Sequence, residues 1–543
     1  MLEPSFQFNR REFIRAALLG LLTVLVSLIF VNTQIDDSYI TFRVARNIAA
    51  GQGYSFNPGE QVYVNTSFLW PLLLAPAYWL GVDIIIWSSI LGGLLAWGMT
   101  FFFYGALRRL GVGFCGAICG AVCLAFSALI ARWHLAGMEM PLALFLFSLT
   151  LYLWLEQRRD TEKRPWFMIT ASLGFLARPE LALLALLLAV DYLFANHRSG
   201  RRVFEMIVLG LLPLLPWLGF ALGAFGSLIP LPYSMKAVGF STGQAWRVIA
   251  ESFSNLAGGD FAVGVALLIV IIAALVRDKK RRLMKRNLGE VWPLAAFALG
   301  NLFFLVLHGV TRISTRYTLL ISISLIALTF WGLSRLWPKM LRNLRENWRN
   351  LAVAIGSVVS FVFFTLFFIM PGVVFLSRIR LPMLHEVARE INEVVEERGG
   401  ERPRVAVSEI GIIGYETDCY VIDTFGLCTP ERADYDDKEG LVNETRPEYY
   451  VAYTPREYYE ETPGFAQLKA EKELLDRWTL AVEEITPDGP RLTTANYPAG
   501  SRPGKSVTID SSRIPARSLG TRHLELFRLR WSEENVLDGV PTF

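Results

Sequence analysis

Two adjacent carboxylates, Asp36 and Asp37, follow the first long apolar run of the sequence. An aspartate at the start of a helix caps free backbone N–H groups and meets the positive end of the helix dipole, and one aspartate is enough for that role. The second carboxylate is therefore a candidate general base or cation ligand. A divalent cation is compatible with the pair, but two adjacent residues specify no further ligands, so the spacing predicts no defined metal site.

Three basic residues, Lys236, Arg312 and Arg316, lie in other segments that join apolar runs. A Lys or Arg side chain can hold a phosphate group through charge-assisted hydrogen bonds. Any one of them could equally lie at the membrane surface with its charge in water. Cations and carboxylates on one face of a membrane would suit a reaction in which a phosphate leaves and a hydroxyl loses its proton.

Charged residues also border the apolar runs themselves. Glu139 stands at the start of an expected helix, where the helix dipole alone would favour a carboxylate. Arg178 and Glu180 separate two short apolar runs, 166–177 and 181–195. The stretch is either one kinked helix or two helices joined by a tight turn, and we favour two helices. Charges in such surroundings usually face a cavity or one another.

The elements that must position these residues are membrane helices. Of the 543 residues, 53% are hydrophobic and 13% aromatic, and only 19% are charged. This composition is too apolar for a soluble protein and excludes a soluble enzyme. Runs close to the bilayer-spanning length of roughly 20 residues recur along the chain. We predict eleven spans, near residues 13–31, 84–107, 112–131, 138–155, 166–177, 181–195, 203–224, 260–276, 291–307, 317–334 and 351–376.

Basic residues predict the orientation of these spans, because cytoplasmic loops retain Lys and Arg during insertion. With the N-terminus inside, 24 basic residues fall in inner segments and 8 in outer segments. No small-residue cleavage site follows the first run, so we expect it to be retained as a helix. An odd number of spans then places the C-terminal part outside a multi-pass plasma membrane protein.

Residues 32–83 form a long first outer loop in this topology. Ile40, Val44 and Ile48 recur on one face of the stretch 38–49, with polar residues elsewhere. This spacing predicts an amphipathic helix that lies on the membrane surface with its polar face in water.

The charge balance divides the chain in two. Residues 1–377 carry 32 basic and 18 acidic side chains, a net charge of +14, whereas residues 378–543 carry 21 and 31, a net charge of −10. We therefore predict a transmembrane module over 1–377 and a soluble extracytoplasmic domain over 378–543, which is long enough to bury its own core.

The C-terminal part shows the short elements of an α/β domain. A helix is expected at 383–397, strands at 404–408, 420–424 and 449–453, turns at Gly411, Gly414 and Gly426, and a long exposed loop near 487–515. Cys419 and Cys428 could form a disulfide outside the cell, but two cysteines fix neither geometry nor redox state.

Taken in order, the motifs resemble those of GT-C membrane glycosyltransferases, and they are most similar to the terminal β-(1→2)-arabinofuranosyltransferases. The motifs are Asp36-Asp-Ser-Tyr-Ile-Thr-Phe-Arg43, Gly51-Gln-Gly53-Tyr, Gly137-Met-Glu139, Arg178-Pro-Glu180, Pro230-Leu-Pro-Tyr-Ser-Met-Lys236, Arg316-Tyr317 and Asp423-Thr-Phe-Gly-Leu. They extend to about residue 430. None is specific alone, but together they indicate this superfamily.

The resemblance implies a sugar donor linked to polyprenyl phosphate and a cell-envelope glycan acceptor, which meet in a cavity at the outer face. Arabinofuranose is one candidate sugar, and nucleic acid is not an expected partner. The acidic pair would activate the acceptor hydroxyl, and the C-terminal domain would help to bind glycan. The resemblance assigns the donor phosphate to Lys236, Arg316 and Arg312, and the cavity lining to Tyr39, Arg43, Glu139, Arg178, Glu180 and Tyr317.

Two other classes of protein compete with this interpretation. A transporter or lipid flippase would place charges deep within several spans and would show repeat symmetry, whereas the charges here gather at the ends of the runs. A membrane-anchored glycan-binding protein would do its work through residues 378–543, and the acidic pair would be dispensable.

Overall fold

The structure is a computed structural model of the chain. It describes residues 8–160, 162–235, 241–258, 289–308, 315–336, 381–397, 399–430, 445, 447–455, 480–486, 489–494, 507–512 and 522–531.

The described residues form two compact units, each of which combines more than one segment of the chain. The first unit contains Met1–Gln34, Thr66–Leu228 and Lys236–Ser377. The second unit contains Ile35–Asn65, Ile229–Met235 and Arg378–Phe543. Two segments of the expected membrane module, one of which carries the acidic pair, thus belong to the same unit as the C-terminal residues.

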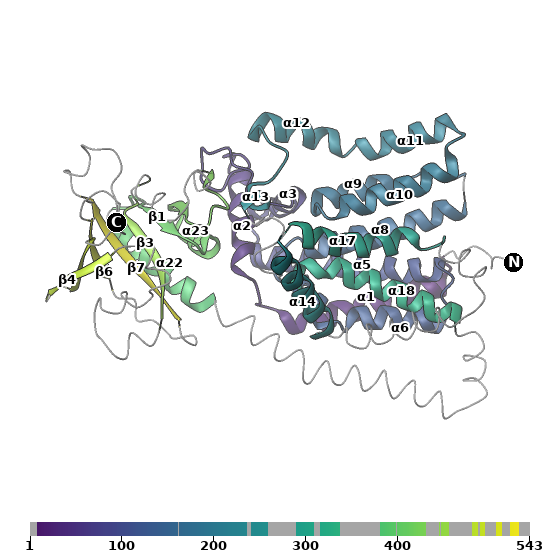
Figure 1. Ribbon diagram of the computed structural model, residues 1–543, viewed down its shortest axis with the longest axis horizontal. Coiled ribbons are helices and arrows are strands. Elements are labelled where there is room, and N and C mark those ends of the chain that lie inside the picture. Colours follow the sequence, from purple (N-terminus) through teal and green to yellow (C-terminus); the bar gives the residue numbers. More distant parts are fainter. Residues whose placement is uncertain are drawn as a thin grey trace, which may run out of the picture. The chain divides into compact units, whose positions relative to one another are not determined.

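The first unit is built from apolar helices (Figure 1). Helix α1 packs against α5, α5 against α8, and α8 against α9. The helices are α1 (Arg10–Ser27), α3 (Leu69–Leu74), α4 (Pro76–Leu80), α5 (Ile84–Arg109), α6 (Phe114–Ala125), α7 (Ala128–His134), α8 (Met140–Arg159), α9 (Phe167–Ala177), α10 (Leu181–Asn196), α11 (Gly200–Leu211), α12 (Leu214–Phe225), α14 (Thr242–Gly258), α17 (Trp292–His308) and α18 (Leu319–Leu336), with 3-10 turns η1 (Leu28–Phe30) and η2 (Thr315–Thr318).

Nine of the eleven predicted spans coincide with described helices, and the spans at 260–276 and 351–376 lie outside the described residues. Among the described residues, four helical stretches are long and apolar enough to cross a membrane: Arg10–Phe30, Ile84–Arg109, Met140–Arg159 and Thr315–Ser334. The number rises to six if each of two bent pairs, α6 with α7 and α11 with α12, counts as one span. The protein is thus a multi-pass membrane protein, and the count of eleven spans stays a prediction.

The breaks in the apolar runs have local causes. Helices α11 and α12 meet at an angle of 42°, and Pro213 stands between them, where it cannot continue the backbone ladder. Helix α9 ends at Ala177 and α10 begins at Leu181, so the favoured two-helix arrangement is confirmed. Pro179 and Glu180 form the turn between them.

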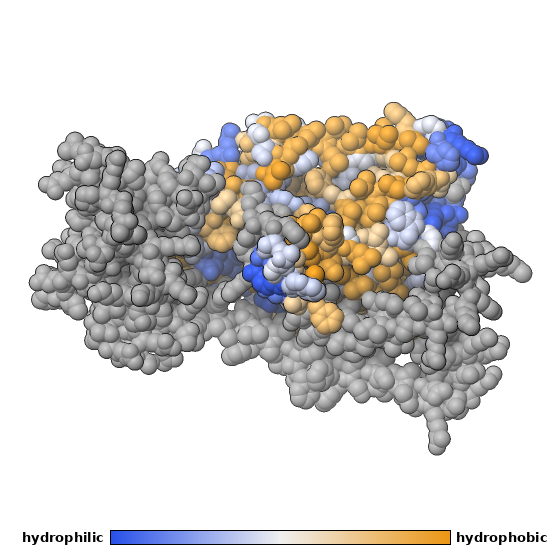
Figure 2. All heavy atoms as spheres, in the orientation of Figure 1, coloured by the Kyte–Doolittle hydropathy of each residue, from blue (hydrophilic) through white to orange (hydrophobic). Residues whose placement is uncertain are grey.

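Apolar side chains cover the outside of this helical unit. Those of α11 and α12 include the exposed side chains of Phe204, Leu211, Leu215 and Leu222. Figure 2 shows a largely hydrophobic surface over these two helices. Polar contacts between helices lie inside, where Ser27 Oγ is 2.7 Å from His134 Nδ1 and Thr23 Oγ1 is 2.8 Å from Thr100 Oγ1. This distribution, apolar outside and hydrogen-bonded inside, is that of a protein whose solvent is lipid.

The second unit contains a seven-stranded sheet in the order β2-β1-β3-β7-β6-β5-β4. Strand β1 is parallel to both β2 and β3, and the other pairs are antiparallel. The elements are α2 (Asp36–Ala49), α13 (Leu231–Met235), α22 (Leu381–Glu397), β1 (Arg404–Val407), α23 (Ile410–Thr417), β2 (Tyr420–Asp423), β3 (Tyr449–Pro455), β4 (Leu480–Thr486), β5 (Gly489–Thr494), β6 (Val507–Ser512) and β7 (Arg522–Trp531).

Buried aliphatic side chains of β1, β2 and α23 form the core of this unit. Val405, Val421, Ile412 and Ile413 are each fully buried, and α22 packs on α23 and β7. The predicted helix at 383–397 and the strands at 404–408, 420–424 and 449–453 correspond to α22, β1, β2 and β3.

Three local predictions were wrong. The stretch 487–515 contains strands β5 and β6, because its alternating residues pair with neighbouring strands. Gly411 and Gly414 lie within α23, and only Gly426, at φ 95°, occupies a turn that favours glycine. Helix α2 does not keep its polar face in water, because Arg43 and Asn47 are buried along with Ile40 and Val44.

Candidate functional site

Asp36, the first residue of α2, bonds to the start of α23. Its Oδ2 accepts a hydrogen bond from the Gly411 N–H at 3.0 Å, and its Oδ1 accepts one from the Ile412 N–H at 2.7 Å. The first N–H groups of a helix have no partner within the helix, so an external carboxylate both satisfies them and meets the positive end of the dipole. An aspartate here was expected to cap the helix that it starts, whereas these bonds of Asp36 cap α23, whose Gly411 lies 375 residues further along the chain.

The environment of Asp36 raises the pKa of its carboxyl group from 3.8 to about 7. Burial of the carboxyl group is the main cause, and the neighbouring carboxylates Glu409 and Asp37 add to it, whereas the two N–H groups of α23 oppose the rise. The residue as a whole is only partly buried. A pKa near neutrality is in the range in which a carboxylate can take up and release a proton.

Asp37 occupies the first turn of α2 and is partly buried. Its charge contributes to the raised pKa of Asp36, so the two carboxyl groups influence each other. The pair therefore belongs to one electrostatic unit, and Asp36 is bonded to the backbone of α23 through the contacts described above.

Arg43, which was expected to line a substrate cavity, is bonded within the second unit and is 1% exposed. Its Nη1 donates to the Gly414 carbonyl at 2.7 Å, and its Nη2 donates to the Cys419 carbonyl at 2.8 Å and to Asn57 Oδ1 at 3.3 Å. Its guanidinium also lies over the Phe56 ring, 4.4 Å from the centroid. Burial lowers the pKa of Arg43 to about 10. These contacts are those of a structural side chain.

Tyr39, another expected cavity residue, belongs to an aromatic cluster. Its ring meets Phe42, Tyr415 and His385 edge to face at centroid distances of 5.3, 5.6 and 6.0 Å, and the residue is 4% exposed. Such edge-to-face contacts fix the orientation of α2 against α22 and α23.

The segment that precedes Lys236 belongs to the same unit as the acidic pair. Pro230 and Pro232 are buried, and the Leu231 N–H donates to the Tyr63 carbonyl at 2.9 Å. Helix α13 is thus attached to the loop that follows α2. Lys236 itself lies outside the described residues.

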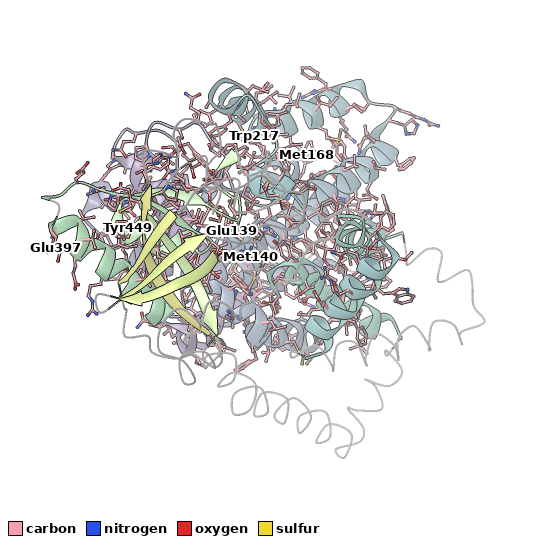
Figure 3. All side chains as sticks on the ribbon, turned by 60° about the vertical axis from the view of Figure 1, so that its left-hand side comes forward. Glu139, Met140, Met168, Trp217, Glu397 and Tyr449 are labelled. Carbon is pink, nitrogen blue, oxygen red and sulfur yellow. The ribbon has the colours of Figure 1, made fainter. Side chains whose placement is uncertain are left out.

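A second charged cluster, in the first unit, joins Glu139, Arg178 and Glu180. Arg178 follows α9, and each glutamate immediately precedes a helix, so all three charges suit the helix dipoles. Arg178 Nη1 is 2.6 Å from Glu139 Oε1, and Arg178 Nε is 3.1 Å from Glu180 Oε2, with a further bond from Nη2 to Glu180. Arg178 and Glu139 are 4% and 3% exposed (Figure 3 labels Glu139).

Tyr317 extends this cluster. The Arg178 guanidinium lies 5.6 Å from the Tyr317 ring centroid, and the Arg316 guanidinium lies 5.3 Å from it. The turn that carries both residues, η2, is held to α7 by a hydrogen bond of 3.1 Å from Trp133 Nε1 to Thr315 Oγ1. Five residues singled out in the sequence are therefore joined in this cluster, directly or through the Tyr317 ring: Glu139, Arg178, Glu180, Arg316 and Tyr317. Arg312 lies outside the described residues.

The Gly137-Met-Glu139 motif is explained by its backbone. Gly137 has φ 79°, a backbone conformation that residues other than glycine rarely adopt. Its carbonyl accepts a hydrogen bond from Trp70 Nε1 at 2.9 Å. This turn brings Glu139 to the start of α8, where it meets Arg178.

Sequence reasoning missed three residues that organise the second unit: Asn57, Gly411 and Asp423. Asn57 bonds through its side chain to both the N–H and the carbonyl of Val421. Asp423 is fully buried and accepts hydrogen bonds from the Phe425, Leu427 and Cys428 N–H groups, and burial raises its pKa to about 6. Asp423 begins one of the motifs quoted above and Gly411 was expected at a turn, whereas Asn57 lies just beyond the Gly51-Gln-Gly53-Tyr motif; nearness to the motifs was the available signal.

Within the described ranges, no group of three or more His, Cys, Asp or Glu residues could hold a metal ion. Cys419 and Cys428 are both buried free thiols in this structure, and burial raises the pKa of each.

Comparison with known proteins finds relatives among membrane glycosyltransferases. The chain is similar to the terminal β-(1→2)-arabinofuranosyltransferase of Mycobacterium tuberculosis, with 28% identity over 264 residues, which are 46% of this chain and 41% of that protein. It is also similar to the enzyme of the same name from Corynebacterium glutamicum, with 29% identity over 296 residues, 49% of this chain and 42% of that protein. Each match thus covers less than half of the relative's length.

Solved structures share the fold at low sequence identity. ArnT from Cupriavidus metallidurans bound to undecaprenyl phosphate has a TM-score of 0.50 and 12% identity, over 94% of this chain and 97% of that chain. The Archaeoglobus fulgidus oligosaccharyltransferase in its apo form has a TM-score of 0.51 and 12% identity, over 91% and 76%. A family model described as a domain of unknown function, DUF8728, matches residues 377–500. The resemblance to GT-C glycosyltransferases inferred from the motifs is confirmed.

Proposed function

We propose that this protein, whose sequence and fold resemble GT-C membrane glycosyltransferases, transfers a sugar from a polyprenyl-phosphate donor to a cell-envelope glycan at the outer face of the plasma membrane. The observation that carries the proposal is the similarity to two terminal β-(1→2)-arabinofuranosyltransferases, together with the fold shared with ArnT bound to undecaprenyl phosphate. Arabinofuranose is the first sugar to test.

The acidic pair supplies the proton acceptor of the proposed reaction. A sugar on a phosphodiester already has a good leaving group, so the protein must mainly orient the donor, accept the acceptor's proton and stabilise the departing phosphate. Asp36 and Asp37 at the start of α2 are the carboxylates we assign to the acceptor side.

Basic residues supply the phosphate side. We assign the donor phosphate to Lys236, Arg316 and Arg312. Arg316 lies beside Tyr317 in the charged cluster, and α13, which leads to Lys236, is attached to the loop that follows the acidic pair. Arg178 already bridges two carboxylates, so its role in the cavity is to hold Glu139, Glu180 and Tyr317 in place.

The proposed topology keeps the N-terminus in the cytoplasm and residues 378–543 outside, where they help to bind glycan. Glu397, at the end of α22, is exposed and suits a labelling test (Figure 3). In a Cys115→Ala background, which removes an exposed thiol, Glu397→Cys should react with a membrane-impermeant maleimide added to intact cells. Reaction only after lysis would reverse the topology.

Activity can be tested with the full chain in lipid nanodiscs. Polyprenyl-phospho-arabinofuranose or a polyprenyl-phospho-hexose is supplied with an arabinan oligosaccharide, and product is followed as a gain of one sugar by mass spectrometry, with and without EDTA. We expect transfer by the wild type and none by the double variant Asp36→Asn/Asp37→Asn. The matched control is Asp83→Asn, because Asp83 caps α5 through the Ile85 and Ile86 N–H groups and Asn caps equally well.

Two results would overturn the proposal. One is equal transfer by the wild type and the double variant, which would remove the acidic pair from the chemistry. The other is counter-flow of lipid-linked sugar in vesicles with no covalent product, which would make the protein a transporter.

A further inference from the structure

Asp36, the first aspartate of the acidic pair, is bonded to a second helix of the same unit. Both oxygens of Asp36 accept hydrogen bonds from backbone N–H groups of Gly411 and Ile412, at the start of the eight-residue helix α23. In a strand–helix–strand unit such as β1-α23-β2, the helix start at the end of the first strand is where an anion usually binds. Here the first outer loop of the same chain fills that position.

The other end of α23 is bonded to cations of the same helix α2. Arg43 donates to the Gly414 carbonyl, and Arg46 donates to the Tyr415 carbonyl at 3.0 Å and to the Asp418 carboxylate. A carboxylate therefore meets the positive end of α23 and two guanidinium groups meet its negative end. The order of charges along α2, acid first and bases later, matches the dipole of α23.

Close approach of the two helices requires glycine on α23. A Cβ atom at Gly411 would overlap the Asp36 carbonyl, and one at Gly414 would lie 2.7 Å from Phe56 and 2.8 Å from Arg43 Nη1. The spacing of three residues puts both glycines on one face of α23, the face that contacts α2 and its loop.

The loop after α2 adds a third contact. Asn57 pairs with both backbone groups of Val421 on β2, which is one of the two edge strands of the sheet. The loop thereby covers an edge that would otherwise offer unpaired backbone groups. Helix α2, its loop, α23 and β2 form one bonded assembly.

We propose that Asp36 is a positioning residue that docks α2 onto α23, and that Asp37 is the member of the pair that accepts the proton of the acceptor hydroxyl. The second half of this statement rests on the proposed function. If Asp36 accepted that proton, one of its oxygens would become a hydroxyl facing an N–H donor, and a charge-assisted bond to α23 would be lost.

Hydrogen exchange tests the docking half without any activity assay. In the full chain in nanodiscs, Asp36→Ala should raise the exchange rate of the peptide covering 410–417 by about 10-fold to 100-fold, because two helix-start N–H groups lose a charged acceptor. Asp36→Asn should fall between Ala and the wild type, because one acceptor oxygen remains. Asp37→Asn should leave this peptide unchanged. Exchange unaltered in Asp36→Ala would overturn the docking role.

A variant outside the acidic pair tests the contact between α2 and α23 independently. Gly411→Ala adds only a methyl group, yet it should raise exchange in α23 and in the peptide covering 36–49 together, because both helices lose their contact. Gly243→Ala is the matched control, since nothing lies within 4 Å of a Cβ at that exposed position. If Gly411→Ala changed exchange no more than Gly243→Ala, the docking contact would be refuted.

Transfer kinetics separate the two carboxylates. For a proton acceptor, Asn and Ala are equally inactive, so Asp37→Asn and Asp37→Ala should both lose nearly all kcat. For a positioning residue, Asn retains more kcat than Ala, which is the order expected at Asp36. Equal loss in both Asp36 variants, with normal exchange, would make Asp36 the base. If the wild type transferred no sugar, the proposed function would fail, while the exchange results would still decide the docking.

Discussion

The two charged clusters of this protein bind their charges in opposite ways. Around α2, the carboxylate of Asp36 and the guanidinium groups of Arg43 and Arg46 bond mainly to backbone groups of α23 and the turn after it. Around Arg178, the charges bond to one another, with one guanidinium shared by Glu139 and Glu180. The first cluster holds the ends of α23 against α2, and the second holds side chains in place because their opposite charges neutralise one another.

The difference indicates what each cluster tolerates. A backbone partner cannot be removed by mutation, so a change in the first cluster exposes N–H or carbonyl groups and loosens the helix contact. A side-chain partner can be removed, and the loss leaves an uncompensated charge in a buried place. Mutations in the first cluster should therefore change mainly how the helices are positioned, and mutations in the second should mainly lower the free energy of unfolding. Four predictions test this contrast.

The largest effect is expected for Asp37→Asn, which removes the proposed proton acceptor. General-base catalysis contributes about 10²-fold to 10⁴-fold, so kcat should fall by that factor. The melting temperature should not change, because the docking contacts of Asp36 and Arg43 remain. Steady-state transfer kinetics and thermal unfolding in nanodiscs measure the two quantities. A lowered melting temperature with unchanged kcat would assign Asp37 to structure.

Arg178→Gln should be the most destabilising change in the second cluster. It leaves Glu139 and Glu180 without their counter-charge, at a cost of about 3–5 kcal/mol in the free energy of unfolding. Arg201→Gln is the control, because Arg201 pairs with Glu205 at 3.1 Å but its side chain is 83% exposed, so the change should cost at most about 1 kcal/mol. Chemical unfolding followed by tryptophan fluorescence would compare them. Equal costs would mean that Arg178 is not a structural bridge.

Within the first cluster, Arg43→Met should cost more than Arg46→Met. Arg43 is buried and donates to three acceptors, so its loss leaves buried carbonyl groups unsatisfied, at about 2–3 kcal/mol. The Arg46 side chain is 26% exposed, and water can replace its contacts. The expected order of melting temperatures is wild type, Arg46→Met, Arg43→Met. The reverse order would contradict a structural role for Arg43 and restore it as a substrate-binding residue.

The smallest effect is a pH dependence of the second unit. The pKa values of Asp36 and Asp423 are raised to about 7 and about 6, mainly by burial, so the folded state holds protons that the unfolded state releases above pH 4. This stabilisation is complete below pH 4 and is lost as the pH rises through 6 and 7. Glu409 and Asp37 contribute to the shift at Asp36.

The melting temperature of the wild type should accordingly fall by a few degrees between pH 5 and pH 8. Asp423→Asn cannot titrate, so the variant should show a shallower decline. A steeper decline in the variant, or a melting temperature that rises with pH in the wild type, would contradict the sign of these shifts.

Much of this architecture could be predicted from local sequence. All nine predicted spans that lie within the described residues coincide with helices, because burial in lipid or in a helix core requires the same long apolar stretches wherever they occur. The helix start at Asp36, the two-helix arrangement around Arg178 and the strands β1, β2 and β3 are also local properties. The sequence also indicated that Glu139 and Glu180 stand beside helix starts and that Arg178 has an opposite charge nearby.

The tertiary structure alone decided how these elements are joined. In the folded chain Glu139 pairs with Arg178, and residues 35–65 belong to the same unit as the C-terminal residues. The face of α2 that was expected in water is buried. Sequence patterns report neighbours within a few turns of a helix or strand, and these contacts cross much larger separations.

The acidic pair shows the limit most clearly. The sequence determined that two carboxylates stand at the start of a helix after the first membrane span. Only the folded chain decided that one of them bonds to residues 375 and 376 positions away. Its partners there are backbone N–H groups, which almost every residue carries, so the sequence alone did not identify them.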